Sequence, residues 1–298
     1  RIGKITNAFN ISIGGTTSIA GPITAYGGTI SLNTNLTTTN NGDISLYTDN
    51  ALGGLGVART INASGSFNYI PRSDFFNAPV TYPISNLNLT SSGLLIGKPT
   101  NTADITFANA TSIAGPITVY GGDIAINENL NTTAGTTSGN VLIKASGDLK
   151  LAANKSITTS GAPVVLWANS DNEATNGSIA LRNGSSIVTG SGSVAGGHVW
   201  LGGGSDGTTW NGLAVGSGYA VPGTIFTPSN GGGNLQSGIY LERNSISSFG
   251  GNIKIAGDGA ATTRGIVTYG NTININAGSG EIELDGQVTS TAIGNRGG

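Results

Sequence analysis

Residues 17–36 read TSIAGPITAYGGTISLNTNL, and residues 111–130, which lie 94 positions later, read TSIAGPITVYGGDIAINENL. Fifteen of these twenty positions are identical, and the match extends backwards without a gap, so that residues 2–36 align with residues 96–130. Self-similarity at a fixed offset is typical of architectures in which similar units stack on one another. The repeat therefore guides the interpretation of the rest of the chain.

A shorter motif lies inside the repeat, with the form Thr/Ser-x-aromatic-Gly-Gly-x-Ile-x-Leu/Ile, at residues 24–32, 118–126 and 247–255. Apolar residues occupy every second position at its end, which is the period of a half-buried strand rather than of a helix. We expect the aromatic-Gly-Gly positions to have a structural role in each copy, namely Tyr26, Gly27, Gly28, Tyr120, Gly121, Gly122, Phe249, Gly250 and Gly251.

The spacing between strand-like segments is about 8 to 20 residues, which leaves no room for crossover helices. No window shows apolar residues at i, i+3, i+4 and i+7. Short strands in non-identical copies predict a stacked-coil architecture, and we expect an all-β, right-handed parallel β-helix that forms one domain over residues 1–298. Coils of about 20 to 25 residues would number about a dozen and give a rod roughly 60 Å long. Asn residues near the turns are expected to stack as ladders of side-chain amides.

Composition narrows the classes of function. Charged residues make up 9% of the chain and the net charge is −2, so there is no basic surface for a nucleic acid. The absence of Cys excludes disulfides and thiolate metal sites. No apolar run is long enough for a membrane span. Because the sequence opens with Arg in the middle of a repeat, we expect it to be a piece of a longer protein.

Two segments depart from the strand pattern, and we expect both to be loop excursions: residues 51–94, where prolines are frequent, and residues 203–236, which are rich in Gly. Their aromatic residues have two interpretations, a cover over one face of the rod or a partner-binding surface, since function concentrates on loops carried by rigid scaffolds. The candidate partner-binding residues are Phe67, Tyr69, Phe75, Phe76, Tyr82, Trp210, Tyr219 and Phe226.

The segments TSIAGPITVYGGDIAI, LLIGKPTNTADITFANATSIAG and GGNIKIAGDG resemble the repeat regions of filamentous-haemagglutinin-like adhesins, which Gram-negative bacteria export by two-partner secretion. The resemblance covers most of the strand-like segments and is weaker across the two excursions. It implies a right-handed parallel β-helix shaft at the bacterial cell surface, with a role in attachment, in a biofilm matrix or in fibres.

The function expected from these observations is structural and adhesive, not enzymatic, with self-association into fibres or binding to surface glycans. The alternatives are a carbohydrate-binding or carbohydrate-active β-helix of the lyase or hydrolase kind, and ice binding by ranks of Thr. Acidic residues are densest at Glu281, Glu283 and Asp285 and at Asp171 and Glu173, and neither group has the spacing of a repeated calcium motif. No cofactor is expected, structural calcium is the alternative, and the single histidine, His198, is expected to be exposed.

Overall fold

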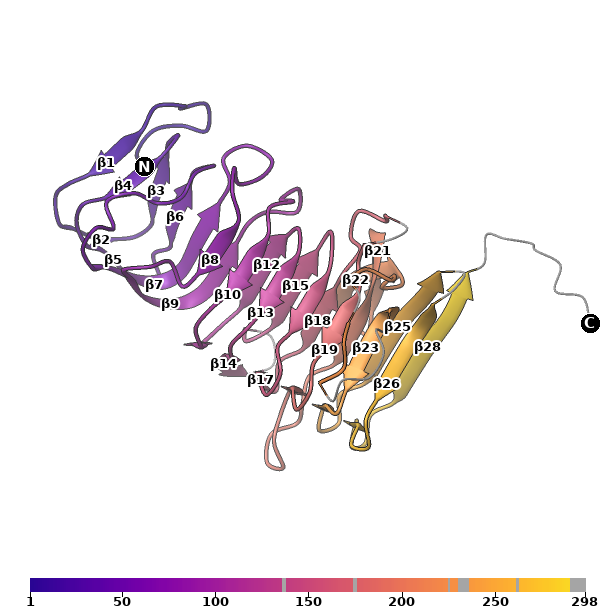
Figure 1. Cartoon of the computed structure of the whole chain (residues 1–298). Coiled ribbons are helices and arrows are strands. Elements are labelled where there is room, and N and C mark those ends of the chain that lie inside the picture. The colour runs from indigo at the N-terminus through magenta and orange to yellow at the C-terminus, as the bar shows by residue number, and fades with distance from the viewer. Residues whose placement is uncertain (136–137, 174–175, 225, 230–235, 261–262, 290–298) are drawn as a thin grey trace, which may run out of the picture.

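The computed structural model describes residues 1–135, 138–173, 176–224, 226–229, 236–260 and 263–289. These residues form 28 strands and contain no helix, and therefore none that could cross a membrane. The strands lie side by side along one long axis, from the indigo N-terminal strands to β28 (Ile282–Thr289) at the yellow end (Figure 1). The prediction of an all-β chain with stacked parallel strands is confirmed.

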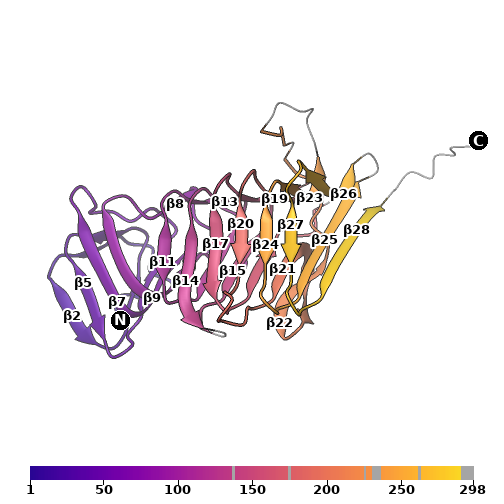
Figure 2. The ribbon, with the colours of Figure 1, turned by 90° about the horizontal axis from the view of Figure 1, so that it is seen from below.

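The strands form three long sheets and one pair. The pair is β1 (Ile11–Ile13) with β4 (Ile30–Leu32). The seven-stranded sheet, in spatial order, contains β26 (Arg264–Tyr269), β23 (Ser237–Glu242), β19 (Ile179–Leu181), β16 (Leu149–Leu151), β13 (Ile124–Ile126), β10 (Ile105–Phe107) and β8 (Val80–Tyr82). The six-stranded sheet, which faces the viewer in Figure 2, contains β11 (Thr111–Ile113), β14 (Leu130–Gly135), β17 (Ser156–Ser160), β20 (Ser186–Val188), β24 (Ser245–Ser247) and β27 (Asn274–Asn276).

The third sheet, which we call the large sheet, has thirteen strands. All its strand pairs are parallel except β21–β22. Its strands are β2 (Thr17–Ala20), β3 (Ile23–Tyr26), β5 (Leu36–Thr39), β6 (Ile44–Tyr47), β7 (Arg59–Ile70), β9 (Leu87–Ile96), β12 (Ile117–Gly121), β15 (Val141–Ala145), β18 (Val164–Trp167), β21 (Val199–Trp210), β22 (Leu213–Gly218), β25 (Ile253–Ala260) and β28.

From β12 onward the chain passes through the large, seven-stranded and six-stranded sheets in that fixed order, and we call one such passage a circuit. In the large sheet, Leu94 pairs with Ile117, Ile117 with Val141, and Val141 with Val164, so these circuits contain 23, 24 and 23 residues. The circuit from Val199 to its partner in β25, Ile253, contains 54 residues because it includes the β21–β22 hairpin.

The core lies between the sheets, because alternate residues of each strand point inward and stack on the equivalent residue of the next circuit. Each inward residue is covered from both sides along the stack, so burial is nearly complete. One rank of the large sheet, with exposures of 4% or less, consists of Ile23, Ile44, Phe67, Leu94, Ile117, Val141, Val164, Val199 and Ile253. The rank continues to Ile282 of β28, which is 47% exposed.

Side-chain hydrogen bonds close the corners between sheets. Where the chain turns from the six-stranded to the large sheet, a buried hydroxyl donates to a carbonyl across the turn, which satisfies a polar group inside the corner. Thr189 donates in this way to Gly197 at 2.6 Å. The same bond is made by Thr132 to Gly139, by Thr159 to Ala162 and by Ser248 to Gly251. Thr38 makes an equivalent bond to Gly42 between β5 and β6, which both belong to the large sheet.

Residues 51–94 were expected to leave the stack, and the structure corrects this expectation. This segment contains β7, β8 and most of β9, all of which pair in parallel with strands of neighbouring circuits. The reason is the length of β7, which bonds β5 near Ile61 and β6 near Phe67 and so continues around a corner. The prolines Pro71, Pro79 and Pro83 lie outside the strands, where they remove no hydrogen bond from the sheet.

Candidate functional site

The outer face of the large sheet carries a rank of large side chains. Tyr26 and Tyr47 are partners in β3 and β6, and their rings stack with centroids 4.5 Å apart. Farther along the same rank, Tyr120 aligns with Lys144 and Lys144 with Trp167, and the Lys144 ammonium lies 3.7 Å from the Trp167 ring centroid. Parallel strands in register place equivalent residues above one another, which explains why the rank forms.

The β21–β22 hairpin interrupts this face. After Gly202, β21 leaves the parallel sheet and returns as antiparallel β22, with Trp210 paired to Leu213. The two residues between them, Asn211 and Gly212, have φ values of 46° and 78°. Positive φ at both positions is typical of a two-residue type I′ hairpin, for which Asn-Gly is the preferred sequence. Asn211-Gly212 was the sequence signal for this hairpin, and it was missed in the sequence analysis.

The hairpin packs on the large sheet through a second, smaller apolar cluster. Val165, Trp167, Trp200 and Val215 are buried there, and Trp210 packs against them. Trp167 and Trp200 meet edge to face with ring centroids 6.2 Å apart, and Trp167 donates its indole N–H to the carbonyl of Gly204 at 2.8 Å. The second predicted excursion therefore does leave the parallel stack at the hairpin, and it is held down by aromatic packing.

A hollow of about 200 Å³ lies between the hairpin and the outer face of β25. Trp200 is 2% exposed and Val215 1%, and together with Ala256 they form the apolar part of its lining. The remaining lining is aromatic, polar or glycine: Thr208, Thr209, Trp210, Gly216, Ser217, Gly218, Tyr219, Lys254 and Asp285.

A hydrogen-bonded pair and an ion pair border the hollow. The Tyr219 hydroxyl donates to Asp285 Oδ2 at 2.8 Å, and this hydrogen bond, with burial and nearby carboxylates, raises the pKa of Tyr219. Lys254 Nζ lies 2.7 Å from Glu283 Oε1. Trp200, Lys254 and Glu283 occupy one register position on β21, β25 and β28, so the parallel register brings an indole, an ammonium and a carboxylate together.

His198 contacts the same hairpin through Trp210. Its ring meets the Trp210 ring edge to face at a centroid distance of 5.7 Å, and its Nδ1 accepts the backbone N–H of Asn252 at 2.8 Å. Burial lowers the pKa of His198, which favours the neutral ring that this acceptor role requires. The expectation of an exposed His198 is corrected, because the side chain is half-buried and hydrogen-bonded.

The aromatic residues predicted as partner-binding in residues 51–94 are mostly core residues. Phe67, Tyr69, Phe76 and Tyr82 are between 0% and 5% exposed, and only Phe75 is exposed, at 49%. Phe67, Tyr69 and Tyr82 face inward because they lie at alternate positions of β7 and β8, which continue the sheets. Phe76 lies between these strands and packs against the Tyr69 ring. The prediction that these residues bind a partner is therefore corrected for the four buried ones, whose side chains belong to the core.

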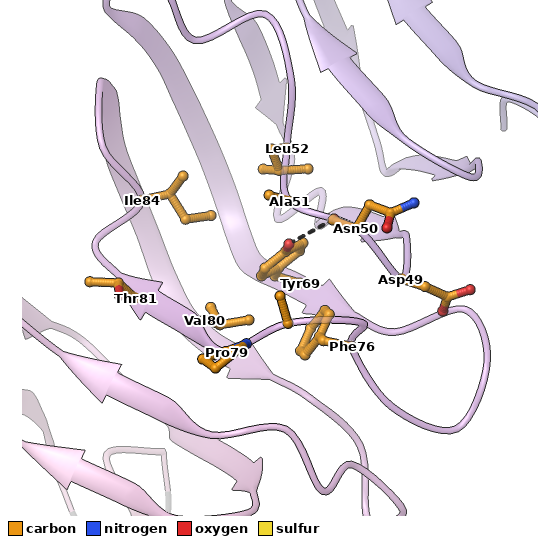
Figure 3. Close-up of a pocket in the computed structure, with 11 residues that line it drawn as sticks. Asp49, Asn50, Ala51, Leu52, Tyr69, Phe76, Pro79, Val80, Thr81 and Ile84 are labelled. Atoms are coloured by element: carbon orange, nitrogen blue, oxygen red, sulfur yellow. Dashed lines mark hydrogen bonds between the residues drawn. The ribbon is translucent and has the colours of Figure 1, made fainter.

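A small hollow of about 90 Å³ remains beside this aromatic group (Figure 3). Tyr69 and Phe76 line it with ring centroids 4.7 Å apart, and the Tyr69 hydroxyl donates to the carbonyl of Asn50 at 3.0 Å. Burial raises the pKa of Tyr69, so the phenol stays neutral and keeps this bond. The hollow has the size of a packing space rather than of a ligand site.

The predicted aromatic residues of the second excursion are divided between two places. Trp210 and Tyr219 line the hollow beneath the hairpin, whereas Phe226 is 4% exposed and stacks on Tyr240 with centroids 5.2 Å apart. Arg182 lies near both of the latter rings and bonds Glu242 at 3.1 Å. Phe226 thus covers the outer face of the seven-stranded sheet, as the first interpretation of the excursions proposed.

The aromatic-Gly-Gly motif contains glycines at points of close backbone approach. A methyl group at Gly28 would lie 2.3 Å from the carbonyl oxygen of Ala8, and one at Gly122 would lie 2.3 Å from that of Thr102. Tyr120 and Gly121 lie at the corner from the large sheet to β13 of the seven-stranded sheet. Tyr26 and Gly27 lie at the corner from the large sheet to β4 of the two-stranded pair. The third copy occupies a different corner, between β24 and β25, where Phe249 is 41% exposed and Gly250 and Gly251 complete the turn.

Acidic residues also align along the stack. Asp104 Oδ1 accepts the N–H of Asp123 at 2.9 Å, and Asp123 Oδ1 accepts that of Asp148 at 2.8 Å. Asp148 is 8% exposed and bonds Ser178 and Thr224, which ties the segment after the hairpin to the seven-stranded sheet. Among the described residues, no three His, Asp or Glu side chains are grouped so that they could hold a metal ion.

Comparison of the chain with protein-family models, with curated proteins and with solved structures finds no match.

Proposed function

We propose that this chain is a rod-like segment of a large bacterial surface adhesin or of a fibre or matrix component, and that it works outside the cell as a structural and adhesive element. In this proposal the three sheets are the walls of a right-handed parallel β-helix like that of filamentous-haemagglutinin-like adhesins. The observation that carries the proposal is the continuous inward rank of the large sheet, which keeps register from Ile23 to Ile253.

A rank of this kind suits a mechanical role. Each circuit buries its aliphatic residues only against its neighbours, so the stack can extend in one dimension without a larger globular core. The surface is polar with few charges, since Lys, Arg, Asp and Glu together make up 9% of the chain. A rod with such a surface can hold a binding element away from the cell without strong electrostatic attraction to unrelated molecules.

The hollow beneath the β21–β22 hairpin favours carbohydrate binding as the form that adhesion takes. It combines aromatic, hydroxyl and charged side chains on an element that projects from the stack. Binding elements are commonly borne on loops and hairpins that a rigid scaffold positions.

Labelling of intact cells tests the proposal. Antibodies raised against the purified chain are expected to label unpermeabilised cells of the organism that makes it, and their Fab fragments are expected to reduce attachment of these cells to glycoprotein-coated glass under flow. Fab fragments against an unrelated surface protein serve as the control. Labelling that appears only after permeabilisation would contradict an extracellular role, and surface labelling without any change in attachment would limit the role to structure.

A further inference from the structure

All three tryptophans of the chain gather in the apolar cluster beneath the hairpin, and two of them, Trp200 and Trp210, line the hollow. Trp167 and Trp200 are buried in the apolar cluster, and Trp210 is half-buried at its edge, where it lines the hollow. Gly202 lets the Trp200 ring lie against the backbone of β21, because a methyl group there would lie 2.6 Å from that ring. The hollow therefore has an aromatic wall, to which Trp200 and Trp210 contribute.

Polar groups that have no side-chain partner among the described residues border this aromatic surface. The hydroxyls of Thr208, Thr209 and Ser217 make no side-chain hydrogen bond within the described residues, and these three residues are exposed. Asp285 accepts the Tyr219 hydroxyl through Oδ2, and within the described part of the chain its Oδ1 accepts no bond. The border therefore offers both donors and acceptors at one edge of an aromatic wall.

This combination fits a neutral sugar ring. A pyranose presents a face of C–H groups, which packs against an aromatic ring, and an edge of hydroxyls, which need donors and acceptors together. The volume of about 200 Å³ is below the roughly 300–1,000 Å³ of sites for drug-sized ligands, so the hollow suits a single ring. The carboxylates of Glu283 and Asp285 disfavour a phosphate or a uronic acid at the same place.

We propose that the hollow between the β21–β22 hairpin and β25 binds one neutral pyranose residue of a surface glycan, with its C–H face on Trp210 and its hydroxyls on Asp285, Lys254 and the border hydroxyls. This inference rests on the proposed adhesive function and names the class of ligand for it. Trp210 positions the ring, and Asp285 supplies the charged acceptor.

Tryptophan fluorescence tests the site directly, because every tryptophan of the chain belongs to this cluster. The purified full chain is titrated with the methyl glycosides of glucose, galactose, mannose and N-acetylglucosamine. At least one of them is expected to shift the emission with a saturable, millimolar Kd. Asp285→Asn is expected to raise this Kd roughly fivefold, since a neutral amide accepts a weaker hydrogen bond than a carboxylate.

Two further variants separate binding from folding. Trp210→Ala is expected to abolish binding, measured by saturation-transfer NMR of the glycoside, and circular dichroism checks that the sheets remain. The matched control is Tyr120→Ala, which is expected to leave the Kd unchanged. Tyr120 lies on the same outer face of the large sheet, but on β12, three strands away from β21, which carries the hairpin.

The inference is overturned if none of the glycosides binds to the folded chain, if folded Trp210→Ala binds as well as the unchanged chain, or if Tyr120→Ala weakens binding as much as Asp285→Asn. Each of these results leaves surface labelling of cells unaffected. Conversely, glycoside binding by a protein that proves to be intracellular would uphold the site and remove the adhesin role.

Discussion

At the residue scale, an Asn or Asp side chain directly before a strand links one circuit to the next by a hydrogen bond. Asn10, Asp43, Asn129 and Asn252 each precede a strand residue, and each accepts through Oδ1 the backbone N–H of a residue one circuit on, at 2.7 to 3.0 Å. The sequence predicted amide ladders between Asn side chains. The structure instead directs these acceptors to backbone donors, because the strand ends leave N–H groups at the corners that need partners.

Glu242 is a buried carboxylate that has both an ion-pair partner and a shifted pKa. It is 1% exposed, accepts the Ser229 N–H at 2.7 Å and pairs with Arg182 at 3.1 Å. Burial alone raises the pKa of Glu242, but the bonds from Ser229 and the Arg182 guanidinium together hold it below the ordinary value of 4.5. The ionised form is therefore favoured in the folded protein over the unfolded chain.

The lowered pKa of Glu242 predicts a pH dependence of stability. Its contribution is fully present above pH 4.5 and is lost as the pH falls through the lower, folded-state pKa. Glu242→Gln is expected to cost about 1–3 kcal/mol at pH 7, because Arg182 loses a charged acceptor, and to flatten the stability profile below pH 4.5. Urea unfolding at pH 7, 4.5 and 3 measures both effects. An equal loss for the variant at every pH would contradict the assignment.

At the element scale, the sequence predicted the strands in which Ile, Val or Leu occupies every second position, as in β12, β13 and β15. The prediction was wrong for residues 51–94, where aromatic residues take the inward positions and proline counts suggested a loop. Local composition cannot reveal that Phe67 aligns with Ile44 and Leu94 of the neighbouring circuits, since the register depends on residues more than twenty positions away. The hollow depends in the same way on Trp210, Lys254 and Asp285, which lie far apart in sequence.

A matched pair of substitutions tests the revised role of the aromatic segment. Phe67 is 0% exposed and lies in the inward rank, so Phe67→Ala is expected to destabilise the protein by about 3–5 kcal/mol. Phe75 is 49% exposed in the turn before β8, so Phe75→Ala is expected to change stability by no more than about 0.5 kcal/mol. Chemical denaturation followed by circular dichroism compares the two. A loss for Phe67→Ala as small as that expected for Phe75→Ala would show that the segment is not part of the core.

For the whole molecule, the coil length expected from the sequence agrees with the length of the regular circuits in the structure. The expected coil of about 20 to 25 residues corresponds to the observed circuits of 23, 24 and 23 residues. The main path of the large sheet has ten strands, which at about 4.8 Å per step gives a stack roughly 45 Å long. The expected dozen coils was an overestimate, because the circuits that contain the hairpin and the turn before it use more residues.

The parallel register also determines how the molecule yields under tension. Hydrogen bonds between circuits run along the stacking axis, so a pull on the two chain ends loads the outermost rung first and can peel the stack one rung at a time. Each released circuit of 23 residues would extend the tether by roughly 75 Å, many times its height in the stack. Optical-tweezers traces are therefore expected to show successive steps of about this size, with one longer step for the 54-residue circuit. A single rupture over the full length would contradict this behaviour, whereas a staircase would show that the stack absorbs a sudden load by releasing its circuits one at a time.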